Sequence, residues 1–120
     1  MADLPFLCDY RRAMEAATTG PYIELLNYFK QFPQKEEQGW KTLTYFDNLN
    51  LADKIKAETL ISVGLQDTVC PPSTIFGVYN HIKSKKESII YNYLGHEFYS
   101  QHIDNKLRWF AKRWTFLVKS

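Results

Sequence analysis

The second half of the chain alternates between segments typical of buried strands and segments typical of helices, and this alternation strongly constrains the fold. Thr59–Leu65 is a short, nearly continuous apolar run rich in residues that favour strands, and Ser88–Leu94 is predicted to be a second strand. A helical pattern at residues 73–83 lies between them. Strands joined through a helix in this way pair in parallel by a right-handed crossover. The pattern therefore predicts an α/β fold with about two parallel strands and flanking helices.

Apolar spacing predicts further helices on both sides of this unit. Leu7–Thr19 and residues 22–32 have helical spacing, whereas the polar residues 31–40 are typical of a surface loop because they include a proline and a glycine. Near the C-terminus, apolar residues recur at steps of four and three: Ile103, Leu107, Phe110, Trp114 and Leu117. We expect this stripe to face the core. We expect the basic residues of the same helix to be solvated: Lys106, Arg108, Lys112, Arg113 and Lys119.

An Asp and a His follow the two predicted strands at equivalent places. Asp67 lies just beyond the first strand and His96 just beyond the second. Reacting groups collect at the carboxyl ends of strands in open parallel sheets, so the two loops are neighbours if the strands are. An Asp that accepts a hydrogen bond from a His fixes its tautomer and leaves the other ring nitrogen to take a proton from a nucleophile. The alternative is that Asp67 caps a turn and His96 is a surface loop residue.

The sequence offers no obvious nucleophile for such a pair. A G-x-S-x-G elbow needs two glycines four positions apart, and the glycines at positions 20, 39, 64, 77 and 95 contain no such pair. Ser62 comes nearest, but it falls in the middle of a strand, where we expect a core serine. Cys70 lies near the carboxylate of Asp67, which disfavours a thiolate, and Cys8 is expected to be a small buried hydrophobe.

Composition and spacing argue against several other kinds of site. The three histidines and two isolated cysteines lack zinc-site spacing, and no glycine-rich phosphate loop is present, so we expect no metal and no cofactor. The aromatic residues of the last helix follow its apolar spacing and not its basic one, so no nucleic acid is expected. No apolar run approaches the ~18 to 20 residues that span a bilayer, and two cysteines suit a reducing compartment. We therefore expect a cytoplasmic chain without a membrane partner.

Five segments of the chain closely resemble the C-terminal half of the acetyl xylan esterase and cephalosporin-C deacetylase family. They are DLPFLCDYRRAME, GPYIELLNYF, KTLTYFDNLNLADKIK, ISVGLQDTVCPPSTIFGVYNHI and YNYLGHEF. The resemblance implies the C-terminal part of one α/β-hydrolase domain. Residues 1–58 would be a helical segment after the nucleophile strand, and residues 59–120 would be the strand-helix-strand-helix unit. Members of the family are serine esterases that remove acetyl groups from short xylo-oligosaccharides and related small substrates such as cephalosporin C.

The resemblance also implies roles for individual residues. Asp67 in QDTVCPPST matches the triad acid and His96 in LGHE the triad base. Phe6, Pro21 and Val69 match positions that line a small acyl pocket, which would favour acetyl over longer acyl groups. The family is typically intracellular and assembles as a doughnut-like hexamer, so the resemblance implies a homo-oligomer.

The chain departs from the family pattern in ways that bear on its function. The family's G-x-S-x-G serine and oxyanion-hole groups belong upstream of Met1, and Phe98-Tyr99-Ser100 stands where some members have glycines. The expected partners are therefore a small acetylated substrate and a nucleophile-bearing N-terminal portion. A strand pair cut from a larger sheet is expected to be poorly soluble alone or to fold only against a partner. The alternatives to a part of an esterase are a noncatalytic assembly or binding module and a truncated remnant.

Overall fold

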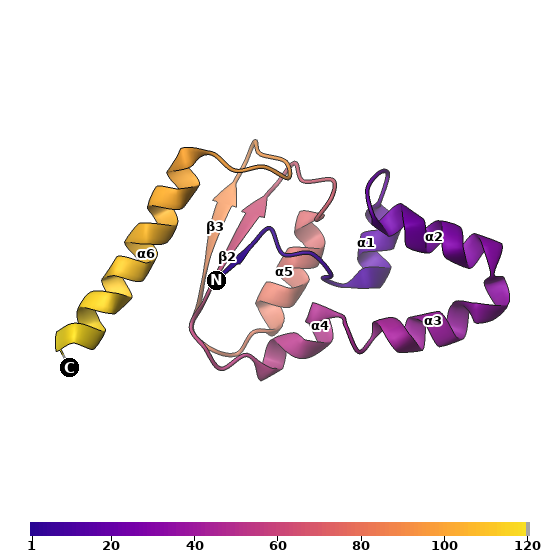
Figure 1. The fold of residues 1–120 in the computed structure, drawn as a ribbon, viewed down its shortest axis with the longest axis horizontal. Helices are drawn as coiled ribbons and strands as arrows, with labels where there is room; N and C mark the ends of the chain where they lie inside the picture. The colour runs from indigo at the N-terminus through magenta and orange to yellow at the C-terminus, as the bar shows by residue number, and fades with distance from the viewer. Residues whose placement is uncertain (120) are drawn as a thin grey trace.

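Three parallel strands form a small sheet at the centre of the molecule (Figure 1). The structure is a computed structural model that describes residues 1–119, with side chains for residues 1–114. The strands lie in the order β1 (Ala2–Asp3), β2 (Thr59–Gly64) and β3 (Lys86–Tyr91). The predicted α/β fold with parallel strands is confirmed. β1 was not predicted, because its two residues are too few to show an alternation of apolar and polar side chains.

Helices make up most of the remaining chain. They are α1 (Tyr10–Ala16), α2 (Tyr22–Gln31), η1 (Pro33–Lys35), α3 (Glu36–Leu43), α4 (Asn48–Leu51), η2 (Ala52–Lys54), α5 (Pro72–His81) and α6 (Ser100–Lys119). The predicted surface loop at residues 31–40 is wrong, because η1 and α3 occupy most of it. Pro33 begins the first turn of η1, where its missing N–H costs nothing. Gly39 lets α3 pack closely on α2, since a Cβ there would lie 2.4 Å from Phe29 Cε1.

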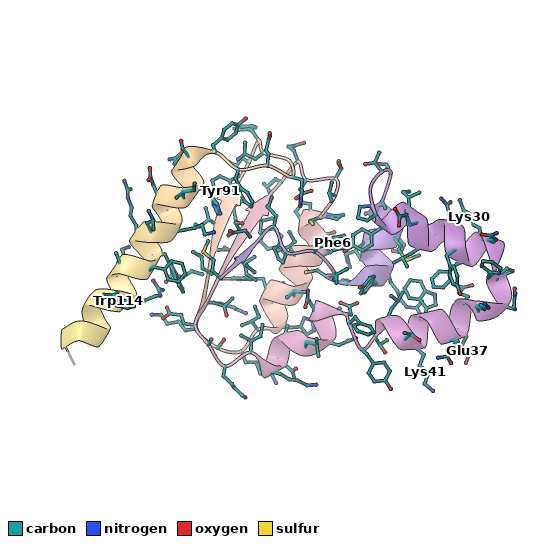
Figure 2. All side chains as sticks on the ribbon, viewed as in Figure 1. Phe6, Lys30, Glu37, Lys41, Tyr91 and Trp114 are labelled. Atoms are coloured by element: carbon teal, nitrogen blue, oxygen red, sulfur yellow. The ribbon has the colours of Figure 1, made fainter. Side chains whose placement is uncertain are left out.

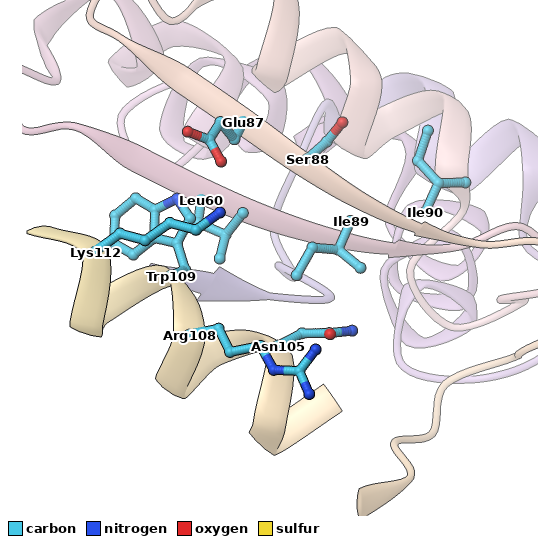
Figure 3. Close-up of a pocket in the computed structure, with 9 residues that line it drawn as sticks. All are labelled: Leu60, Glu87, Ser88, Ile89, Ile90, Asn105, Arg108, Trp109 and Lys112. Atoms are coloured by element: carbon cyan, nitrogen blue, oxygen red, sulfur yellow. The ribbon is translucent and has the colours of Figure 1, made fainter. Parts of the chain in front are cut away.

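β2 is the most deeply buried element, because side chains cover both of its faces. All six of its residues are buried. On one face, Ile61 and Val63 pack with Ile75 and Val78 of α5 in the main apolar cluster. On the other face, Leu60 lines the space between β2 and α6 (Figure 3). The register pairs Gly64 with Tyr91, so β2 and β3 end side by side.

α6 lies beside the sheet, away from α1–α5 (Figure 1), and turns a different face to it than the sequence predicts. The predicted apolar stripe is exposed where the structure describes its side chains, with relative exposures of 48 to 71% for Ile103, Leu107, Phe110 and Trp114. The side chains of Leu117 and Lys119 lie outside the described part. The residues toward the sheet recur at the same spacing one position earlier: His102, Lys106, Trp109 and Arg113.

Charged side chains of the sheet favour the face that α6 turns toward it. Asp3 and Glu87 point their carboxylates toward α6, where they pair with Lys106 and Arg113. The expectation that these two basic residues are solvated is therefore wrong. Arg108 and Lys112 are exposed, as predicted. Among the described residues, no helix is both long and apolar enough to cross a membrane.

The molecule is elongated rather than compact. Its radius of gyration is 16.6 Å, whereas a compact chain of this length would have about 13 to 14 Å. The pair α2 and α3 extends to one side with exposed charged residues such as Lys30, Glu37 and Lys41, and α6 extends to the other (Figures 1 and 2). A cavity of about 440 Å³ remains between α6 and the sheet (Figure 3). The face of the sheet toward α6 is thus only partly filled.

Candidate active site

Asp67 is held in the turn that follows β2. Its carboxylate is buried, with a side-chain exposure of 0%. Oδ1 accepts hydrogen bonds from the backbone N–H groups of Val69 at 2.8 Å and Cys70 at 2.7 Å. These bonds belong to the turn before Pro71 and Pro72, which introduce α5. A buried carboxylate fixed at one oxygen in this way can present the other to a single partner.

That partner is His96. Its Nδ1 lies 2.9 Å from Asp67 Oδ2. With the hydrogen on Nδ1, the ring donates to the carboxylate and Nε2 is the basic nitrogen. The His96 side chain is 44% exposed, so the ring is open to a reactant while its partner is buried. The structure therefore brings together the two residues that the sequence places at the strand ends.

The two loops are joined through their backbones as well as through this pair. Leu65 N–H donates to Tyr91 O at 2.9 Å, and Gln66 N–H donates to Leu94 O at 3.0 Å. A Cβ on Gly64 would lie 2.6 Å from Gly95 O and 2.7 Å from Leu94 O. Only glycine permits the end of β2 to approach the His96 loop this closely. These main-chain contacts hold the segment before His96 against the Asp67 side of the site.

Cys70 lies close enough to Asp67 and His96 to raise the question of a metal. One ligand-type atom from each of the three residues lies within 4.8 Å of the others. Burial, and then the nearby Asp67 carboxylate, raise the pKa of the Cys70 thiol to about 12. The thiol is therefore neutral at pH 7, whereas a metal binds the thiolate. Since both carboxylate oxygens of Asp67 already accept hydrogen bonds, the arrangement suits proton transfer better than metal binding.

The serine and the second cysteine singled out by the sequence are structural. Ser62 has an exposure of 0%, and its Oγ accepts a hydrogen bond from Leu4 N–H at 3.1 Å. This bond ties the segment after β1 to the middle of β2, so Ser62 is a core serine as predicted. Cys8 is also fully buried in the main apolar cluster, and burial raises the pKa of its thiol to about 12.

Of the three residues expected at an acyl pocket, Phe6 and Val69 pack against the cluster that contains Cys70, whereas Pro21 lies in the separate segment before α2. Val69 directly follows the Asp67 turn. Phe6 lies between two residues in the left-handed region, Leu4 with φ 41° and Leu7 with φ 57°. Such strained backbone persists only where its surroundings hold it. Here Asn48 Nδ2 donates to Phe6 O at 2.8 Å. Pro21 is exposed and is the N-cap of α2. The next residue, Tyr22, has its ring centroid 4.8 Å from that of Phe6.

A second Asp and His pair near the site was not found from the sequence. His102 of α6 is buried, and its ring nitrogens lie near Tyr91 and Asp3. The available signal was the polar spacing on α6, where His102 and Lys106 occupy the same face one position ahead of the apolar stripe. The apolar stripe is the more regular pattern, so the sequence predicts that the stripe, and not the His102 face, meets the sheet.

Comparisons with known proteins agree on one family. A family model described as acetyl xylan esterase matches residues 1–113. The acetyl xylan esterase from Paenibacillus sp. R4 superimposes with a TM-score of 0.84 at 44% identity, over 89% of this chain and 35% of that one. Acetyl xylan esterase 1 from Thermoanaerobacterium sp. JW/SL YS485 gives a TM-score of 0.76 at 40% identity, over 88% and 35%.

A curated sequence points the same way over a shorter stretch. The acetyl esterase Axe7A of Xylanibacter ruminicola is 43% identical over 49 residues, which are 41% of this chain and 11% of that protein. The chain therefore spans about a third of the length of these two esterase structures and a smaller share of this curated relative.

Proposed function

The chain belongs to the acetyl xylan esterase family, and from that premise we propose that it supplies the acid and the base of a serine acetyl esterase. The observation that carries the proposal is the 2.9 Å contact between His96 Nδ1 and the buried carboxylate of Asp67. A carboxylate in this position selects the tautomer with a free Nε2 and stabilises the imidazolium that forms during turnover. The 44% exposure of His96 leaves Nε2 available to a reactant.

In the proposed mechanism, His96 Nε2 transfers two protons, one in each half of the reaction. Nε2 takes the proton from a serine hydroxyl, and the serine oxygen adds to the acetyl carbonyl. When the tetrahedral oxyanion collapses, Nε2 gives the proton to the leaving alcohol and an acetyl-enzyme remains. Nε2 then takes a proton from water, whose oxygen attacks the acetyl-enzyme, and returns it to the serine as acetate leaves. Asp67 stays ionised throughout and fixes the ring.

The serine would come from a nucleophile-bearing N-terminal portion, which is our proposed partner. Two surfaces of this chain support the proposal. β1 pairs with β2 along one edge, which leaves its other edge available for a further strand. The stripe of Ile103, Leu107, Phe110 and Trp114 on α6 offers exposed apolar area for packing. Assembly of completed units into a homo-oligomer, a hexamer as in the family, is part of the same proposal.

The proposed substrates are small acetylated molecules, with acetylated xylo-oligosaccharides and cephalosporin C as the candidates. Phe6, Pro21 and Val69 would line the acyl pocket. The rigid segment around Phe6 supports this, because a pocket wall held by hydrogen bonds and packing cannot easily yield to a longer acyl chain. Each methylene that a pocket excludes is worth about 1 to 3 kcal/mol of discrimination, so acetate esters should be hydrolysed faster than butyrate esters.

Complementation tests the proposal directly. This chain is mixed with the part of the Paenibacillus sp. R4 acetyl xylan esterase that it does not cover, and the hydrolysis of chromogenic acetate and butyrate esters is followed. We expect acetate turnover from the mixture and none from either part alone. His96→Gln or Asp67→Asn should lower kcat by about 10²- to 10⁴-fold. His81→Gln is the matched control, because His81 is exposed on α5 and its Nδ1 contacts only the main-chain oxygen of Gly77.

Two outcomes would contradict the proposal. Turnover by the chain alone that depends on His96 would show that no external nucleophile is needed. Stable association without turnover would favour the second candidate function, a noncatalytic assembly or binding module. The exposed stripe on α6 is the specific observation that supports the module, since it offers a binding surface whether or not a serine is delivered to His96.

A further inference from the structure

We propose that His102 is a positioning residue that holds the loop carrying His96 against the end of the sheet. The inference rests on the proposed function in one respect only, namely that His96 is the base. The loop consists of residues 92–99 and joins β3 to α6. Tyr91 ends β3 beside the start of α6 (Figure 2).

His102 is a buried hub with three different neighbours. Only 3% of it is exposed. Its Nδ1 lies 2.7 Å from the hydroxyl of Tyr91. Its Nε2 lies 3.1 Å from Asp3 Oδ1. Its ring stacks on Phe98, with centroids 4.4 Å apart and an angle of 14° between the planes.

One tautomer of His102 accounts for both polar contacts. With the hydrogen on Nε2, Nδ1 accepts the Tyr91 hydroxyl hydrogen. Nε2, carrying its hydrogen, then lies 3.1 Å from Asp3 Oδ1, an electrostatic contact that does not have the alignment of a hydrogen bond. Lys106, one turn further along α6, pairs with the same carboxylate. The buried ring thus meets a hydroxyl on one side and a charge-compensated carboxylate on the other, which fixes its orientation.

These contacts close the His96 loop at its base. Tyr91 is the last residue before the loop, and His102 is the third residue of α6 after it. Phe98, within the loop, stacks on the same ring. A loop whose ends are joined and whose interior is packed has fewer conformations to lose when His96 docks on Asp67. Without the His102 contacts, the loop would be held by the main-chain hydrogen bonds at Leu65 and Gln66 and by the His96–Asp67 pair itself.

α6 has a second, separate attachment, and this makes the inference testable. Arg113 pairs with Glu58 and with Glu87, and its guanidinium lies 3.5 Å from the centroid of the Trp109 ring. Glu58 precedes β2 and Glu87 lies near the start of β3, at the opposite end of the strands from His96. Breaking the Arg113 pairs should loosen α6 without releasing the His96 loop. Breaking the His102 contacts should do both.

The experiment compares Tyr91→Phe, His102→Phe and His102→Gln with the control Arg113→Gln by NMR on the full chain. Tyr91→Phe removes one hydroxyl, whereas His102→Phe keeps a ring for Phe98 to stack on and removes both polar contacts. Two signals report on the site: the low-field resonance of the His96 Nδ1 proton at Asp67, and hydrogen exchange of the Gln66 amide, which donates to Leu94 O. The amide of Ile82 at the end of α5 serves as the internal reference.

We expect Tyr91→Phe and His102→Phe to broaden or abolish the His96 signal and to speed Gln66 exchange at least about fivefold relative to Ile82, as the loss of a hydrogen bond implies. His102→Gln, which can both donate and accept, should restore part of each signal. Arg113→Gln should leave both unchanged. If His102→Phe does not fold, Tyr91→Phe carries the test alone.

The inference is overturned if both signals persist in a variant that is globally destabilised, because His102 would then only stabilise the fold. It is also overturned if the His102 variants retain full kcat in the complementation assay, a result that leaves the proposed function intact. Loss of the His96 signal in Tyr91→Phe would support the positioning role even if complementation gave no turnover, so the two proposals can fail separately.

Discussion

The two helices that flank β2 and β3 are attached to the sheet by different forces. α5 buries Ile75, Val78 and Ile82 to exposures of 0 to 4% in the main apolar cluster. Within its described side chains, α6 buries Trp109 and contacts the sheet through His102, Lys106 and Arg113. Burying an aliphatic side chain stabilises a fold by about 1.5 to 3 kcal/mol, whereas a surface ion pair contributes about 0 to 1 kcal/mol. The α5 side should therefore dominate stability, while the α6 side serves mainly to hold the His96 loop.

The largest effect should come from truncating an aliphatic side chain on α5. Ile75 is fully buried, so Ile75→Ala should lower the free energy of unfolding by about 2 to 5 kcal/mol, the usual cost of a cavity. Leu107→Ala on α6 removes a side chain that is 61% exposed and should change stability by less than about 0.5 kcal/mol. Urea unfolding followed by circular dichroism measures both.

Ile75→Ala and Leu107→Ala together test whether α5 and α6 differ in this way. A large loss from Leu107→Ala would mean that the exposed stripe of α6 is covered in solution, either by another copy or by a different packing of the helix. Repeating the measurement over a range of protein concentrations separates these two cases, because self-association makes apparent stability depend on concentration.

A smaller loss of stability than that of Ile75→Ala is expected from adding a side chain where β2 approaches the His96 loop. Gly64→Ala places a Cβ 2.6 Å from Gly95 O, and main chain cannot yield as a side chain can. We expect a loss of about 1 to 3 kcal/mol from overpacking, together with loss of the low-field His96 signal. Gly77→Ala is the control on α5, where the nearest atom to the new Cβ would be Leu49 Cδ1 at 3.6 Å. Removing a glycine from the helix interior should raise stability by about 0.5 to 1 kcal/mol. Equal stability of the two variants would contradict the close approach at Gly64.

The same contrast explains which elements the sequence could predict. β2 and α5 were predicted because their burial is apolar and leaves a period: an unbroken run for a strand covered on both faces, and Ile75, Val78 and Ile82 on one side of a helix. The bounds of β3 were less accurate, since the strand begins two residues earlier than expected, at Lys86, and ends at Tyr91. Lys86 belongs to the charged run KSKKE, which has no strand pattern, but its Nζ donates to the main-chain oxygens of Tyr79 and Ile82 at the end of α5.

The face of α6 could not be predicted, because its choice depends on groups distant in the sequence. The apolar stripe and the His102 face differ by one residue, and the carboxylates of Asp3 and Glu87 favour the His102 face. At the candidate site, the strand-end rule anticipated that Asp67 and His96 meet. It gave no indication of Tyr91 or His102, whose contacts arise only once β3 and α6 are placed side by side.

The smallest effect should appear in the pH dependence of the α6 attachment. Hydrogen bonds from Arg113, and then from Lys85, lower the pKa of Glu58 from its ordinary value of 4.5. A pKa that is lower in the folded than in the unfolded state means that the ionised group stabilises the fold above that ordinary value, and that this contribution is lost as the pH falls through the folded pKa. Glu58→Gln should therefore lower the urea midpoint at pH 7 by less than Gly64→Ala does, and the difference from the parent chain should vanish at pH values below the folded pKa. Added salt should shrink this difference at pH 7.

Glu15→Gln is the control, because Glu15 is exposed on α1, and it should show no such change with pH. A difference for Glu58→Gln that persists at low pH would mean that Glu58 acts through packing rather than charge, and α6 would then resemble α5 more closely than its ion pairs suggest.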